Sequence, residues 1–156
     1  MSTITATAAK ATIPGEIRWY PEAASQSYLK GEFLYLDNAG RLNVCTSDYA
    51  GIAGIAEAPA SGTTGAASPV TIAKRGQQFT MNVTNAGSSQ ITANAQVGRH
   101  YSLYVASNIH YCDIGDTGIQ RFVVDAIAPD NTVGDTYGRV IVEVCKGYAQ
   151  LDMTTS

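Results

Sequence analysis

Charge is scarce in this sequence. Asp, Glu, Lys and Arg make up 15% of the 156 residues, whereas an average globular chain has roughly a quarter. The ten basic residues are scattered, with Lys74 and Arg75 as the one adjacent pair, and the formal net charge is −3. Because nucleic-acid binding depends on clustered basic side chains, this pattern disfavours a nucleic-acid partner. Low charge favours instead a chain that buries surface against other proteins.

Long apolar runs are also missing. No stretch of about 18 apolar residues, the length that spans a membrane, occurs in the chain. The first residues lack the apolar segment of a secretion signal. We therefore expect no membrane partner, and a protein that is made and kept soluble.

The common motifs of catalytic and metal sites do not occur. The sequence has no Gly-x-Ser-x-Gly elbow, no phosphate-binding loop that ends in Lys-Ser/Thr, and no Cys-x-x-Cys pair. The three cysteines, Cys45, Cys112 and Cys145, are odd in number and widely spaced. We predict that they are buried, reduced thiols, since free cysteine is among the most buried residue types.

One polar group in the last third of the chain comes nearest to a reactive cluster. Its members are His100, His110, Cys112, Asp113 and Asp116. A hairpin over 100–105 and 108–112 places the two histidines on neighbouring strands, but no tight ligand spacing accompanies them. The Asp and Gly residues at 113–118 are typical of turns. The sequence therefore predicts no metal, no cofactor and no catalytic residue.

The periodicity of apolar residues predicts strands and no convincing helix. Residues 31–46 form the clearest hairpin, because two runs of β-formers flank an Asp-Asn-Ala-Gly turn. Residues 77–83 alternate, with Phe79, Met81 and Val83 inward and Thr80 and Asn82 outward. Further strands are expected at 70–73, 98–105, 108–112, 121–127 and 139–145. This pattern predicts an all-β fold, a small β-barrel or sandwich of about nine short strands.

The segment 51–79 is the stretch around which we expect the fold to be arranged. Ala and Gly at positions 50, 51, 53, 54 and 56 allow neighbouring chain to approach closely, as at the tight bends of small barrels. The loop at 58–69 has no reactive side chain and is predicted to be a surface connection.

The N-terminal residues are predicted to form an extended arm. We divide the chain into an arm at 1–27, a β-barrel domain at 28–150 and a flexible tail at 151–156. Residues 1–16 are rich in Thr and Ala and have too little apolar area to fold alone, so the arm is expected to order on a partner. Its predicted partner-interface residues are Ile4, Ile13, Ile17, Trp19 and Tyr20. Alternatively, Trp19 holds the arm against its own barrel.

Four segments together resemble a known family. They are Gly-Glu-Phe-Leu-Tyr-Leu-Asp at 31–37, Gly-Ile-Ala-Gly-Ile-Ala-Glu-Ala-Pro-Ala-Ser-Gly at 51–62, residues 70–79, and the closing Val-Gly-Asp-Thr-Tyr-Gly-Arg-Val-Ile-Val-Glu-Val at 133–144. In pattern, residues 28–145 resemble the capsid decoration (cement) proteins of tailed bacteriophages. The resemblance implies a compact β-barrel, often a homotrimer, on the outer capsid surface of a virion. It implies that the partner is the major capsid protein, and that the chain is made in the host cytoplasm and is not an enzyme.

Two other functions stay open. The nine tyrosines and two histidines suit a carbohydrate- or ligand-binding β-barrel module of a virion fibre or surface protein. A hydrolase of an unrecognised type is the third reading.

Overall fold

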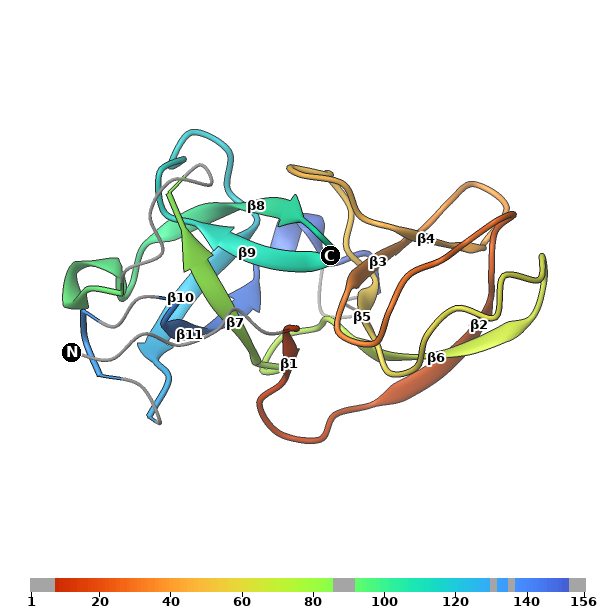
Figure 1. The fold of residues 1–156 in the computed structure, drawn as a ribbon, viewed down its shortest axis with the longest axis horizontal. Helices are drawn as coiled ribbons and strands as arrows, with labels where there is room; N and C mark the ends of the chain where they lie inside the picture. The colour runs from red at the N-terminus through yellow and green to blue at the C-terminus, as the bar shows by residue number, and fades with distance from the viewer. Residues whose placement is uncertain (1–7, 86–91, 130–131, 135–136, 152–156) are drawn as a thin grey trace.

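The computed structural model describes residues 8–85, 92–129, 132–134 and 137–151. These residues form eleven strands and two short 3-10 helices, η1 (Asn94–Gln96) and η2 (Lys146–Tyr148). The predicted all-β fold is confirmed. The strands are arranged in two lobes that lie side by side (Figure 1).

The first lobe is a closed barrel. Its strands, in sheet order, are β1 (Lys10–Ala11), β7 (Phe79–Thr84), β11 (Arg139–Val144), β10 (Phe122–Ile127), β8 (His100–Ala106) and β9 (Ile109–Asp113). All neighbours in this order are antiparallel. A parallel pairing of β7 with β9 closes the strands from β7 to β9 into a ring, and β1 pairs with β7 outside that ring. Residues Phe79, Met81 and Val83 point into its core, as their alternation predicts.

The second lobe is a smaller sheet that curls toward closure. Its strands, in order, are β2 (Ile17–Pro21), β6 (Ala67–Ile72), β5 (Gly54–Ala56), β3 (Phe33–Leu36) and β4 (Leu42–Val44). A single bridge between Glu22 and Leu42 brings the chain after β2 to the start of β4. The sheet encloses a small core of its own, formed by Tyr28, Leu34, Leu42, Ala56 and Val70.

Strands β3 and β5 form a wall that both lobes share. Phe33 and Ile55 face the larger core, while Leu34 and Ala56, the next residues along the same strands, face the smaller one. Side chains alternate between the two faces of a strand, so an apolar strand can serve two cores at once. The predicted hairpin is confirmed, and its first strand is covered on both faces as expected.

The outer face of β7 differs from the prediction. Thr80 and Asn82 were expected to face solvent, but both are buried. The hydroxyl of Thr80 lies 2.8 Å from that of Thr12, and the amide of Asn82 donates hydrogen bonds to the carbonyls of Tyr137 and Gly138. Segments distant in sequence therefore cover this face, which alternation within one strand does not reveal.

The N-terminal segment is also placed differently from a free arm. Within 1–27, β1 pairs with β7 and β2 pairs along its whole length with β6, and Ala9 is buried in the larger core. These residues therefore order on their own chain, because strand pairing supplies the main-chain hydrogen bonds that a Thr/Ala segment lacks alone. Residues 1–7 and 152–156 lie outside the described residues.

Close chain approach at Gly54 confirms the expectation for the segment 51–79. A Cβ atom added to Gly54 would lie 2.8 Å from Cγ1 of Val70 and 2.9 Å from Cα of Ile72. Ile72 is paired with Gly54 across the β5–β6 strand pair. Its backbone therefore cannot move away from an added Cβ atom without breaking the hydrogen bonds between the two strands. We predict that Gly54→Ala lowers the free energy of unfolding by about 3 kcal/mol through overpacking, as measured by urea denaturation.

Gly147 provides the matched control for this change. A Cβ atom there meets nothing within 4 Å, so Gly147→Ala should leave stability unchanged or raise it slightly. Equal stability of the two variants would contradict the close approach at Gly54.

Candidate binding surface

The most exposed large apolar side chains near one another in sequence lie at β2. The side chain of Trp19 is 64% exposed and that of Ile17 is 52% exposed, and both occupy alternate positions on the same face of the strand. Ile13, in the loop that leads into β2, is 57% exposed. We call Ile13, Ile17 and Trp19 the β2 strip.

Two other predicted interface residues fall elsewhere. Tyr20 points to the opposite face of β2 and packs against the smaller core, as the alternation with Trp19 requires. Ile4 lies outside the described residues. Of the predicted interface residues, Ile13, Ile17 and Trp19 are therefore the exposed ones.

The main chain of β2 is open along one edge. Ile72 N–H donates to Glu16 O at 3.0 Å, and antiparallel pairs alternate between bonded and non-bonded. Arg18 and Tyr20 therefore bond to β6, while the main-chain groups of Ile17 and Trp19 point away from it. Among the described residues, the contact on that side comes only after the strand, where Ala23 N–H donates to Leu42 O at 3.0 Å.

Polar groups beside the strip are satisfied within the chain. A groove of about 340 Å³ adjoins Ile17, and in its wall the Thr71 hydroxyl donates to the Glu57 carboxylate at 2.6 Å. Glu16 lies 2.8 Å from Lys74 Nζ and 2.6 Å from Arg18 Nε. Hydrogen bonds from Lys74 and Arg18 lower the pKa of the Glu16 carboxyl. The apolar strip is therefore bordered by charges that are already paired.

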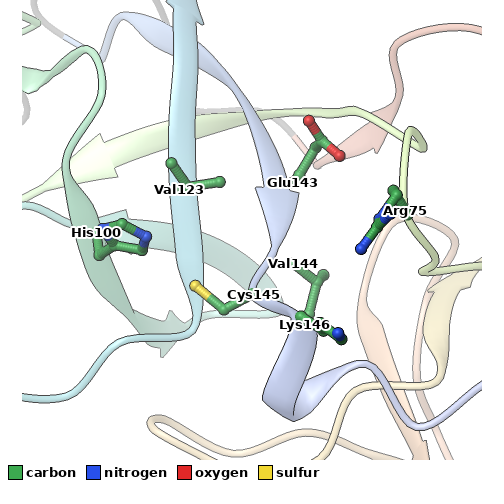
Figure 2. A pocket seen from close by; sticks show the side chains of 7 residues that line it. All are labelled: Arg75, His100, Val123, Glu143, Val144, Cys145 and Lys146. Atoms are coloured by element: carbon green, nitrogen blue, oxygen red, sulfur yellow. The ribbon is translucent and has the colours of Figure 1, made fainter. Parts of the chain in front are cut away.

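A second hollow, of about 230 Å³, lies on the outer face of the barrel (Figure 2). His100, Val123 and Glu143 are cross-strand neighbours on β8, β10 and β11, and Cys145 lines the same hollow. Burial raises the pKa of the Cys145 thiol more than the nearby Arg121 lowers it. A thiol whose pKa is raised is a weaker nucleophile at neutral pH.

The two histidines lie on neighbouring strands, as the predicted hairpin over 100–105 and 108–112 requires, but not opposite each other. His110 pairs with Val105 near the tip of the β8–β9 hairpin, whereas His100, at the start of β8, pairs with Val123 of β10. The register therefore separates them along the strand. In the part of the chain that the structure describes, no group of three or more His, Cys, Asp or Glu side chains is placed to hold a metal ion.

The remaining members of that cluster have structural roles. Asp113 and Asp116 accept hydrogen bonds from the main-chain N–H groups of Gly115 at 3.0 Å and Gly118 at 3.1 Å, which is turn chemistry. Cys45 and Cys112 are free and buried, as predicted, and burial raises the pKa of both thiols. Cys145 is free but only half-buried.

No protein-family model matches the chain, and no curated protein is similar to it. Among the described residues, no helix is long and apolar enough to cross a membrane. The surface of the chain itself is therefore the basis for assigning a function.

Glu143 lines the hollow close to Asp125, where a β-bulge interrupts the register of β10 with β11. Burial and the neighbouring Asp125 raise the pKa of Glu143, against an opposing hydrogen bond from Gly76 N–H. The folded chain thus holds this proton more tightly than the unfolded chain, so ionisation of Glu143 lowers stability as the pH rises above about 4.5.

We predict that Glu143→Gln is more stable than the parent protein at pH 7, and that the gain disappears near pH 4. Glu16→Gln should show the opposite sign, because the pKa of Glu16 is lowered: it loses stability at pH 7, and the loss disappears on acidification. Urea denaturation of the three proteins at both pH values is the measurement. A gain for Glu143→Gln that persists at pH 4 would contradict the raised pKa.

Proposed function

We propose that this chain is a structural virion protein that binds the outer surface of a tailed-phage capsid and stabilises the shell by clamping neighbouring major capsid proteins. The observation that carries the proposal is the β2 strip, where exposed apolar side chains coincide with an open strand edge. The strand pattern that resembles decoration proteins supports it.

The β2 strip has the composition of a protein-binding surface. Tryptophan is enriched among the residues that dominate interface energies, and the single Trp of the chain is the most exposed large apolar residue described. Complete burial of one large apolar side chain contributes about 1.5–3 kcal/mol. Three such side chains supply a modest affinity for each site, which suits a protein that binds a shell through several linked contacts.

The open edge suggests how the capsid protein is held. An extended segment of the major capsid protein lies along β2 and completes the hydrogen bonds of Ile17 and Trp19, while its side chains contact the strip. Pro21 at the end of β2 has no N–H group, so the added strand is short.

Symmetry favours a trimeric arrangement on the shell. Capsid surfaces present threefold and quasi-threefold positions, and a protein that occupies them is naturally a cyclic trimer. We therefore propose that the docked protein is a homotrimer.

Replacement of Trp19 by Ser tests the strip. Trp19 is mostly exposed, so stability should change little, whereas affinity for capsid shells prepared without this chain should fall about 100-fold, the size of an interface hot spot. Co-sedimentation with such shells measures the affinity. Ile119→Ser is the matched control, because Ile119 is an exposed apolar residue, 39% accessible, that lies outside the strip.

The outcomes separate clearly. Tight binding by Ile119→Ser and weak binding by Trp19→Ser support the strip as the anchor. Wild-type affinity in Trp19→Ser would show that the β2 strip is not the capsid-binding surface. Failure of the parent protein to bind shells would overturn the proposed function.

A further inference from the structure

Two lysines line the groove beside Ile17. Lys10 belongs to β1 and Lys30 lies in the loop before β3, and both residues are exposed. The groove also includes Ile17 and its cross-strand neighbour Thr71, so it lies where β1 meets the second lobe (Figure 1). Through Ile17, the groove is continuous with the β2 strip.

The fold keeps the two lysines on segments that contact each other. A Cβ atom added to Gly31, the residue after Lys30, would lie 2.6 Å from the carbonyl oxygen of Ala9, the residue before Lys10. Lys10 and Lys30 therefore belong to neighbouring stretches of main chain. Because like charges repel each other, two cations at one groove are more easily accommodated when an anion lies between them.

The groove's own acid does not fill this role. Glu57 is the one acidic residue that lines the groove, and its carboxylate accepts a hydrogen bond from the Thr71 hydroxyl at 2.6 Å. Lys30 Nζ lies 4.0 Å from the other oxygen of Glu57, with its side chain 68% exposed. An exposed ion pair at this distance is weak.

Lys10 has no countercharge. Within the described part of the chain, its ammonium group forms no ion pair. The other two cations beside the β2 strip, Arg18 and Lys74, are both paired with Glu16. An anionic group that contacts Ile17 therefore finds its countercharge at Lys10, with Lys30 as the second cation.

We propose that this groove binds the carboxylate of an Asp or Glu side chain from the partner polypeptide that contacts the β2 strip. The inference rests on the proposed function, because it specifies the chemistry of that same partner. The carboxylate accepts hydrogen bonds from the ammonium groups of Lys10 and Lys30. A nucleic acid suits the groove less well, since Glu57 lines it as well and would repel a chain of phosphates.

The lysines and the strip contribute differently to binding. Burial of Ile17 and Trp19 supplies most of the affinity, because apolar burial is the larger favourable contribution. Charge pairing at the rim of an interface mainly steers the partner and selects its orientation. The groove therefore favours a partner segment with an acidic residue beside its apolar ones.

The test uses the full chain at low salt and capsid shells prepared without it. Lys10→Gln should weaken binding to the shells about tenfold, and Lys30→Gln should weaken it less, because Glu57 already lies near Lys30. Lys10→Arg keeps the charge and should bind as the parent does. Lys146→Gln is the matched control: it removes one exposed lysine at the hollow of Figure 2, outside the groove, and should also bind as the parent does.

Salt dependence distinguishes charge pairing from a structural role of Lys10. An increase in NaCl from about 50 mM to about 500 mM should weaken the parent protein more than Lys10→Gln, because salt screens exposed charges. A cryo-electron microscopy map of the decorated shells should place an Asp or Glu of the capsid protein within about 4 Å of Lys10 Nζ, the limit of an ion pair.

The outcomes separate this inference from the proposed function. Parent-like affinity and salt dependence in both Lys10→Gln and Lys30→Gln would overturn the inference and leave the β2 strip as the anchor. An equal loss in Lys146→Gln, or a map with no carboxylate at Lys10, would also overturn it. Lys30→Gln lies outside the strands, so it keeps the test decisive if Lys10→Gln disturbs β1. Failure of the parent protein to bind shells would overturn the proposed function together with this inference.

Discussion

The packing of Phe33 is the contact on which both lobes depend. Its ring centroid lies 5.3 Å from those of Phe79 and Phe122, on two different strands of the barrel. The next residue, Leu34, enters the core of the second lobe. One strand thereby anchors two cores, and truncation of Phe33 would open a cavity in the larger one.

The wall formed by β3 and β5 determines which surfaces of the second lobe remain exposed to solvent. β2 is an edge strand of the second sheet, with β6 beside it, and Ile17 and Trp19 on its outer face are exposed. The same wall places Glu32, immediately before β3, against His110 of the barrel. The exposed β2 and the buried contact of Glu32 with His110 are therefore consequences of one arrangement.

Local signals in the sequence predicted the elements well. The β3–β4 hairpin follows from its turn, where the Asp37 carboxylate accepts N–H groups of Ala39 and Arg41. The closure of the barrel was not predictable, because the parallel pairing of β7 with β9 depends on register between distant segments. The same holds for β1 and β2, whose Thr/Ala-rich surroundings have no clear periodicity.

The candidate sites also include residues that the sequence predicts and contacts that it does not. Ile17 and Trp19 were predicted as interface residues and are exposed, but Tyr20, predicted with them, packs against the smaller core because it lies on the opposite face of β2. The contact between Glu32 and His110 was not predictable, since the two residues are 78 positions apart and neither belongs to a motif. The hairpin that places His100 and His110 on neighbouring strands was predictable, but their positions along it depend on the register, which pairs His110 with Val105.

The measurement that tests the central claim most directly is a cryo-electron microscopy map of capsid shells incubated with this protein. The account predicts density for the chain on the outer surface, with the β2 strip against the major capsid protein and an extended capsid segment along the open edge of β2. A map in which Trp19 and Ile17 face solvent, or shells that bind none of the protein, would contradict it.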